Sequence, residues 1–218
     1  MAKINNFSVT PLFASPLYQT SLGSLDVKMK DFIINTEFER MPANNGDYSV
    51  NKYILDCPEL AGLKEKIMAH VHNFVYEVLD AKKNMDFQME NSWVNRHYSN
   101  DFSGEHYHGN SLISGVYYIE TTLDSGAIVF HKDKSTYNLW TETIRVDFNY
   151  QDNFDEGKLN VYNAQGWGLR PKKNDLVLFP SLLNHSVEDN RSDIVRYSLA
   201  FNIFPRGKAG GPINTLTV

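Results

Sequence analysis

The sequence predicts an α+β protein, in which N-terminal helices pack outside a C-terminal antiparallel jelly roll, or double-stranded β-helix. One long helical pattern lies before residue 82, and from residue 86 onward short strand-like runs are divided by Gly, Asn, Asp and Pro turns. No repeat, low-complexity segment or linker interrupts the 218 residues. We therefore expect a single domain over 1–218. It comprises an extended and helical segment (1–85), the jelly-roll core (86–205) and a tail (206–218).

The N-terminal segment contains two helical patterns. Residues 7–21 alternate and include two prolines, which favours an edge strand or an extended lead-in. Residues 25–38 are typical of a short helix, and 40–53 have the composition of a loop. The clearest helix begins near Pro58, since proline is tolerated in a first turn, and runs to about Ala81. Its apolar residues recur at spacings of three and four: Leu60, Leu63, Ile67, Val71, Phe74, Val75 and Val78.

Seven strand-like runs follow. They cover residues 87–98, 112–121, 126–131, 139–149, 158–163, 175–180 and 195–204. The last stretch, from Pro205 to Val218, is rich in glycine and is expected to be a partly ordered tail.

Composition excludes several classes of function. A net charge of −5 argues against general affinity for nucleic acid or an anionic membrane. The single cysteine, Cys57, excludes an internal disulfide and fits a reducing compartment. The first residues lack the apolar core of a signal peptide, and no apolar run is long enough to span a bilayer. We expect a cytoplasmic protein without nucleic-acid or membrane partners, and a homodimer is left open.

Three histidines outline a metal site. His106 and His108 are two residues apart on an extended segment, so their side chains project from the same side of the backbone. His185 lies far downstream, just before a strand-like run that contains Arg196. One such histidine would be read as an ordinary polar loop residue. Two close ligands, one remote ligand and an arginine, in this order, favour a mononuclear non-heme iron site instead.

Other candidate ligands are weaker. Alternation would point His97 away from whatever Tyr98 faces, and His131 ends a strand that is followed by charges, a solvent-facing pattern. The nearest carboxylates are Asp101 and Glu105, but Glu105 should point opposite to its histidine neighbours. His70 and His72 are not one helical turn apart, so they cannot form a helical zinc pair and are expected at the surface or its boundary.

An ordered set of motifs resembles the 2-oxoglutarate/Fe(II)-dependent oxygenases, especially the prolyl-hydroxylase-like branch and its bacterial and phage members. The motifs are a His-x-His followed by a Ser-Gly-Val-Tyr-Tyr strand (106–118), a Gly-containing strand ending in Phe (125–130), an apolar strand leading to the distal histidine (171–187), and Arg-Tyr-Ser-Leu-Ala-Phe-Asn (196–202). The resemblance covers roughly residues 87–205.

The resemblance implies roles for the three histidines. His106 and His185 match the two family histidines that bind iron. His108 occupies the place where most of the superfamily has aspartate. With a neutral imidazole in place of a carboxylate, the iron site has one negative charge fewer.

The resemblance also implies a cosubstrate site. Arg196 matches the arginine that holds the distal carboxylate of 2-oxoglutarate, for which a planar guanidinium offers two parallel hydrogen bonds. Ser198 faces the same way on the same strand. Tyr118 and Tyr98 match cosubstrate-side tyrosines, and the amide of Asn95 is a further partner.

The expected function is oxidative decarboxylation of 2-oxoglutarate coupled to hydroxylation of a small molecule or a protein side chain, with Fe(II) and 2-oxoglutarate required and ascorbate as an additional cofactor. Two alternatives remain open: a cupin-like metal enzyme that does not use 2-oxoglutarate, and a non-enzymatic binding protein on a degenerate oxygenase fold. The segment 132–175, with Trp140, Tyr150 and Trp167, is expected to cover the mouth of the site.

Overall fold

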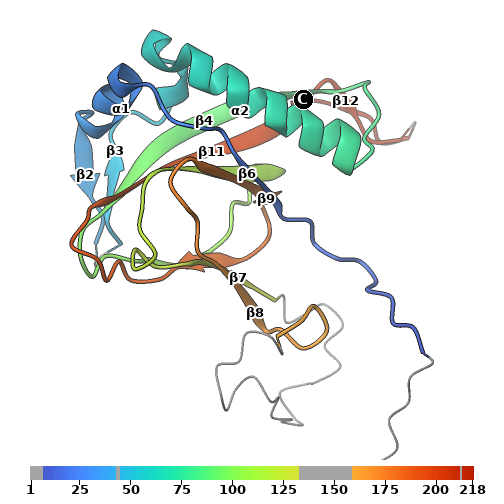
Figure 1. Cartoon of the computed structure of the whole chain (residues 1–218). Helices are drawn as coiled ribbons and strands as arrows, with labels where there is room; N and C mark the ends of the chain where they lie inside the picture. Colours follow the sequence, from blue (N-terminus) through green and yellow to red (C-terminus); the bar gives the residue numbers. More distant parts are fainter. Residues whose placement is uncertain (1–6, 43–44, 133–158, 212) are drawn as a thin grey trace, which may run out of the picture.

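Two antiparallel sheets form the body of the protein in a computed structural model that describes residues 7–42, 45–132, 159–211 and 213–218 (Figure 1). The large sheet has seven strands, in the order β1 (Tyr18–Ser21), β9 (Asp175–Pro180), β6 (Ile113–Glu120), β11 (Arg196–Arg206), β4 (Asp86–His97), β3 (Asp47–Ser49) and β2 (Phe38–Arg40). The small sheet has four, in the order β5 (Ser103–His106), β10 (His185–Val187), β7 (Ile128–His131) and β8 (Gly166–Leu169). A two-stranded ribbon, β12 (Lys208–Ala209) and β13 (Leu216–Thr217), ends the chain.

The two sheets face each other across a small apolar cluster. Tyr118, Val177 and Phe179 of the large sheet pack there against Ile128 and Phe130 of the small sheet. All strand pairs in the described sheets are antiparallel. This arrangement confirms the antiparallel jelly roll that the sequence predicts.

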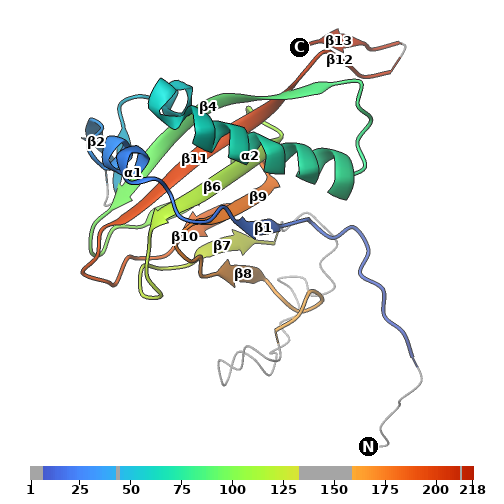
Figure 2. The same ribbon diagram turned by 45° about the horizontal axis from the view of Figure 1, so that its top comes forward.

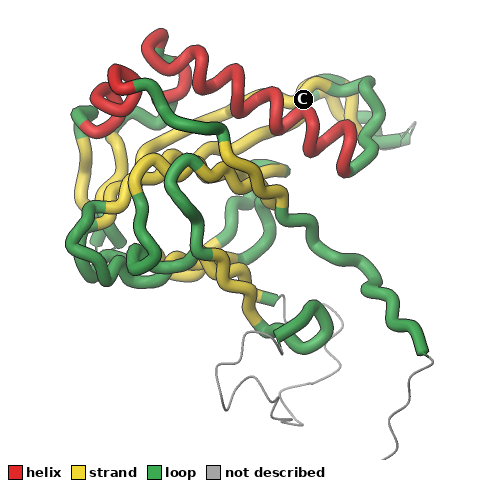
Figure 3. Tube along the Cα trace, in the orientation of Figure 1, coloured by secondary structure: helices red, strands yellow, loops and turns green. Residues whose placement is uncertain are grey.

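The helices lie against the other face of the large sheet (Figures 2 and 3). They are α1 (Val27–Ile34), the 3-10 turns η1 (Ile54–Asp56) and η2 (Pro58–Leu60), α2 (Ala61–Asn73) and a π-helical turn, η3 (Phe74–Val78). The side chain of Asp26 caps α1 by accepting from the N–H groups of Lys28 and Met29. On α2, the buried residues Leu63, Ile67 and Val71 recur every four positions, so they form one stripe that joins the main apolar core.

The alternation of side chains along β11 divides the protein into two environments. Leu199, Phe201 and Ile203 belong to the core that contains the helix residues. Arg196 and Ser198 point the other way and line a pocket between the sheets. The period of two therefore places large apolar residues under the helices and leaves Arg196, Ser198 and the small Ala200 in the pocket.

The structure differs from the predicted elements in two described places. Residues 40–53, predicted as a loop, contain β3 and the end of β2. The described part of the predicted strand 158–163 forms turns, and β8 begins only at Gly166. The predicted strand 139–149 lies outside the described residues. β1 is an edge strand, one of the two forms predicted for residues 7–21, and the tail, for which no strand was predicted, contains the β12–β13 ribbon.

Among the described helices, none is both long enough and apolar enough to cross a membrane.

Candidate metal centre

A cavity of about 430 Å³ opens between the two sheets. Its walls come from β4, β6 and β11 of the large sheet and from β5, β7 and β10 of the small sheet. All three histidines that the sequence singles out line it, and so does Arg196. Residues from widely separated motifs therefore meet in one place.

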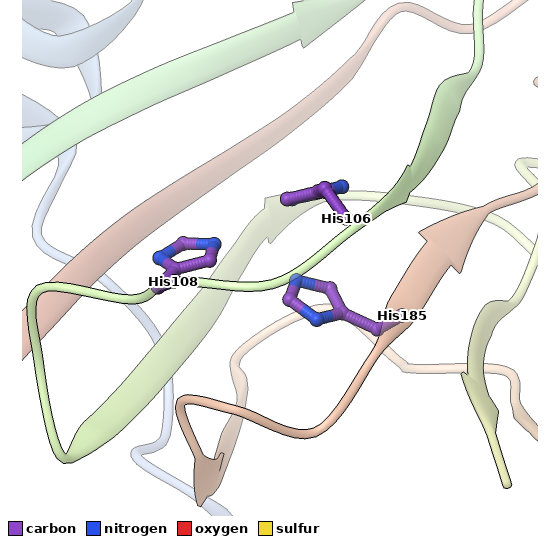
Figure 4. A group of neighbouring side chains, drawn as sticks. All are labelled: His106, His108 and His185. Carbon is purple, nitrogen blue, oxygen red and sulfur yellow. The ribbon is translucent and has the colours of Figure 1, made fainter. Parts of the chain in front are cut away.

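His106, His108 and His185 form a cluster with their ring nitrogens close together (Figure 4). One nitrogen from each ring lies within 4.8 Å of the others. His185 begins β10 and lies directly opposite His106, the last residue of β5, while His108 follows two residues later. Among the described residues, no cysteine or carboxylate completes the group.

The hydrogen bonds of the three rings leave the same nitrogen free in each. Nδ1 of His106 lies 2.7 Å from the carbonyl oxygen of Gly104, and Nδ1 of His185 lies 2.9 Å from that of Leu183. Nδ1 of His108 lies 2.7 Å from Oδ1 of Asn202. Because these oxygens only accept hydrogen bonds, each Nδ1 carries the proton and each Nε2 keeps its lone pair. This is the pattern of histidines that bind metal through Nε2.

Burial also keeps two of the rings neutral. It lowers the pKa of His185 to about 4, although the hydrogen bond to the Leu183 carbonyl acts in the opposite direction. Burial likewise lowers the pKa of His108. A neutral imidazole is the form that binds a metal ion, so this donor set fits a divalent metal such as iron(II).

Arg196 is a buried cation that forms no ion pair with a described carboxylate. Its side chain is only 1% exposed, and Nη1 donates to the carbonyl oxygen of Ser125 at 2.6 Å. Its Nε has no hydrogen-bond partner, and no carboxylate in the described parts of the chain forms an ion pair with it. Burial lowers the pKa of Arg196 to about 10, so the guanidinium remains charged at neutral pH. Such a group fits a ligand that brings a carboxylate.

Three of the four predicted neighbours of Arg196 line the same cavity. They are Ser198, Tyr118 and Asn95. Burial raises the pKa of Tyr118, which keeps its hydroxyl protonated and able to donate.

The prediction that Tyr98 faces this site is wrong. Tyr98 is 43% exposed, does not line the cavity, and has the guanidinium of Arg96 5.2 Å from its ring centre. It follows the last residue of β4, on the parity opposite to Asn95. The residue of the correct parity is His97, which sequence reasoning set aside.

His97 lines the cavity directly opposite Arg196 in the β4–β11 register. It is 1% exposed, Nε2 lies 3.1 Å from Oγ of Ser103, and Nδ1 has no partner in the described structure. Burial, with the charge of Arg196, lowers the pKa of His97 to about 3. The sequence signal for His97 is its spacing of two from Asn95, because residues two apart on a strand face the same side and His97 is then expected to face the site with Asn95.

The remaining candidates are not part of the histidine cluster, although Glu105 lines the cavity. His131 is half-buried rather than solvent-facing, with Nε2 2.8 Å from Oγ of Ser186, and does not line the cavity. Asp101 is paired with Arg40, and Glu105 accepts a hydrogen bond from Asn184. His70 and His72 are both half-buried, as expected of boundary residues.

The segment expected to cover the site can be traced only in part. Trp140 and Tyr150 lie outside the described residues. Trp167 is on β8 and 41% exposed.

The fold resembles known oxygenases. A "2OG-Fe(II) oxygenase family" oxidoreductase from Burkholderia pseudomallei is 13% identical, with a TM-score of 0.54 over 81% of this chain and 75% of that one. HygX from Streptomyces hygroscopicus, solved with nickel and 2-oxoglutarate, is 10% identical, with a TM-score of 0.57 over 88% and 83%. The α-ketoglutarate-dependent carbocyclase SnoK from nogalamycin biosynthesis is 12% identical, with a TM-score of 0.58 over 87% and 79%.

Sequence comparison identifies the family. A search of curated protein sequences found no match. A family model described as "Putative 2OG-Fe(II) oxygenase" matches residues 91–202, which is slightly more than half of the chain and includes all three histidines and Arg196. The chain therefore belongs to this 2OG-Fe(II) oxygenase family.

Proposed function

We propose that this protein is a 2-oxoglutarate- and Fe(II)-dependent hydroxylase of the prolyl-hydroxylase-like, His-x-His type. One observation carries the proposal: three Nε2 atoms that are free to bind a metal share a cavity with a buried guanidinium that has no ion-pair partner among the described residues. The match to the oxygenase family supports it. So do the similar folds of HygX, solved with iron and with nickel plus 2-oxoglutarate.

The metal would be held by Nε2 of His106, His108 and His185. His106 and His185 are fixed relative to each other by the pairing of β5 with β10, and His108 is held by the bond from its backbone N–H to the Ser181 carbonyl, at 2.9 Å. Bound Fe(II) would supply oxygen activation coupled to the decarboxylation of 2-oxoglutarate. The protein's part is to present three neutral nitrogens from one side and leave the other side of the ion open.

The cosubstrate's far carboxylate would be bound by Arg196. Its Nε is free to donate, and the hydroxyls of Ser198 and Tyr118 line the same cavity. Val116 and Ile128 are apolar lining residues, so water is restricted around the ion pair that would form. A lower local dielectric strengthens such a pair.

The substrate would be a small molecule or a protein side chain. Hydroxylation is the reaction that we propose, although the similar folds include a carbocyclase and an epimerase. Iron, oxygen and 2-oxoglutarate are common to these outcomes. The substrate and its placement decide between them.

The first experiment measures succinate. Purified protein with Fe(II), 2-oxoglutarate and ascorbate is expected to release succinate, even without substrate, at a low uncoupled rate. His106→Ala should remove this activity, whereas His131→Ala should retain it because His131 lies on the same small sheet but outside the cavity. Absence of succinate from the unaltered protein across candidate substrates would contradict the proposal.

The same variants separate the alternatives. If Arg196→Ala removes 2-oxoglutarate binding but metal-dependent activity on a substrate persists, the protein is a metal enzyme that does not use 2-oxoglutarate. If calorimetry finds no tight metal binding and His106→Ala has no effect, the fold serves as a non-enzymatic binding protein.

A further inference from the structure

The three clustered histidines differ in what orients their rings. Nδ1 of His106 and of His185 both donate to the backbone carbonyl of the residue two positions earlier. A side-chain substitution cannot remove these acceptors. His108 instead donates to the side chain of Asn202, which is 94 residues away in the chain. Of the three rings in Figure 4, His108 is thus the one whose tautomer depends on a particular side chain.

Asn202 belongs to an uncharged group of side chains that we call the amide–serine cluster, in which Asn91 is half-buried and the others are buried: Asn91, Ser111, Ser114, Ser181 and Asn202. Asn202 is 4% exposed, and the three serines are 0–4% exposed. Oγ of Ser181 lies 2.5 Å from Oγ of Ser111 and 2.9 Å from that of Ser114. No charged side chain takes part in these hydrogen bonds.

The cluster fixes which end of the Asn202 amide faces His108. Nδ2 of Asn202 donates to Oδ1 of Asn91 at 2.9 Å, and the hydroxyl of Ser114 donates to Oδ1 of Asn202 at 2.8 Å. The carbonyl end is therefore left towards His108. If the amide were reversed, its N–H would occupy Nδ1 of His108 and the ring proton would move to Nε2, which would block a metal there.

The plane of the His108 ring is held separately. The indole of Trp93 stacks on it, with ring centres 5.8 Å apart and an angle of 24° between the planes. Stacking sets the plane of the ring but not the position of its proton. The hydrogen bond to Asn202 sets which ring nitrogen carries the proton.

We propose that Asn202 is a positioning residue, which holds His108 in the Nδ1–H tautomer and so makes Nε2 of His108 a metal donor. The inference rests on the proposed function for its metal but not for its hydrogen bond. The side-chain oxygen of Asn202 accepts the Nδ1–H of His108, as a backbone carbonyl does for each of the other two rings. Because its amide is neutral, it orients the ring without adding the charge that a carboxylate would bring.

Nuclear magnetic resonance of the full-length, metal-free protein tests the tautomer. Two-bond ¹H–¹⁵N correlations at pH 8 should show Nδ1 of His108 protonated, with the signals assigned by their loss in His108→Gln. In Asn202→Leu, which has nearly the same shape but no acceptor, the Nδ1–H form should be lost or mixed with the Nε2–H form. Ser181→Ala removes another buried hydroxyl of the cluster but leaves the Asn202 carbonyl in place, so it should keep the original tautomer.

Affinity for Zn(II) or Co(II) tests the consequence. Loss of a group that orients a metal-binding histidine typically weakens metal binding about 10- to 100-fold, which is the change expected for Asn202→Leu. Ser181→Ala should stay within about threefold of the unaltered protein. Wild-type tautomer and wild-type affinity in Asn202→Leu would overturn the proposal.

Asn202→Asp covers the case in which the leucine variant does not fold. Aspartate keeps an acceptor oxygen of the same size, so His108 should keep its Nδ1–H proton and metal affinity should equal or exceed that of the unaltered protein. A clear loss of affinity in a folded Asn202→Asp variant would refute the role. If the unaltered protein has the expected tautomer but binds no metal, the proposed function fails, while the Asn202–His108 hydrogen bond stands.

Discussion

Replacing Arg196 with methionine should separate binding from stability. Methionine keeps an unbranched apolar stem of similar length but removes the charge and every hydrogen-bond donor. In a buried ion pair, removing one partner usually destabilises the fold by about 3–5 kcal/mol, because the other charge is left unpaired. Arg196 has no such partner in the described structure, so a different outcome is expected.

The magnitude follows from two opposing effects. Burial lowers the pKa of Arg196 from 12.5 to about 10, and at about 1.4 kcal/mol per unit the charged form is disfavoured by about 3 kcal/mol. The hydrogen bond from Nη1 to the Ser125 carbonyl contributes about 1.5–3 kcal/mol in return. We therefore expect the free energy of unfolding of metal-free Arg196→Met to lie within about 1–2 kcal/mol of the unaltered value.

Binding should change far more. Losing one side of a desolvated carboxylate–guanidinium contact costs about 2–5 kcal/mol, or about 30-fold to several thousand-fold in the dissociation constant of 2-oxoglutarate. Calorimetry on the Zn(II)-loaded protein measures this constant, and urea unfolding measures stability.

Arg206→Met is the matched control, because Arg206 lies at the other end of β11 in an exposed pair with Glu90. It should cost at most about 1 kcal/mol of stability and leave 2-oxoglutarate binding unchanged. The reasoning is refuted if Arg196→Met loses 3–5 kcal/mol of stability while 2-oxoglutarate affinity is retained, since Arg196 would then be a structural cation.

Three further predictions concern packing, pH and metal. Gly115→Ala should lower the free energy of unfolding by about 1–3 kcal/mol in urea titrations, because a Cβ there would collide with the ring of Phe201. The control is Gly62→Ala on α2, where the new Cβ has ordinary contacts; it should be neutral or stabilising by up to about 1 kcal/mol. The pKa of Asp101 lies below its ordinary value. Burial alone would raise this pKa, but hydrogen bonds from Arg40 and from the Tyr98 N–H outweigh the effect of burial. Asp101 therefore stabilises the fold above its unfolded pKa, near 4, and this stabilisation is lost as the pH falls through the folded pKa. The free energy of unfolding, measured from pH 6 to pH 3, should fall less steeply for Asp101→Asn than for the unaltered protein. Equal slopes would contradict this role of Asp101. Zn(II) at 100 times its dissociation constant should raise the free energy of unfolding by about 2.7 kcal/mol. His185→Ala should abolish that increase and His131→Ala should not; a similar Zn(II) effect in both would place the metal elsewhere.

Much of the fold follows from local patterns. The strands 87–98, 112–121, 175–180 and 195–204 were predicted within about two residues, because alternating apolar and β-branched residues report a strand directly. The hairpin of β2 and β3 was missed, since three-residue strands rich in charge and tyrosine have no such pattern. The family assignment was likewise available from an ordered set of motifs, and the family model agrees with it.

The roles of particular site residues were only partly predictable. The His106–His108 spacing, together with His185, predicted a cluster that the structure brings within 4.8 Å. The prediction exchanges Tyr98 and His97, because it counts the alternation of the strand from Tyr98 instead of from Asn95. Asn95 and Tyr98 are both predicted in the site although they have opposite parity on the strand, and the structure shows that Asn95 is the one that faces the cavity.

Local features follow from the amino-acid sequence alone: which residues share a strand face, where turns fall, and which side chains carry metal-binding or carboxylate-binding chemistry. These depend on backbone periodicity and residue type, which act over a few positions. Two relations appear only in the folded protein: Arg196 is buried with no ion pair to a carboxylate of the described residues, and His108 donates to Asn202, 94 residues away. Such relations depend on which strands pair and in what register, and the burial of the whole core selects that arrangement.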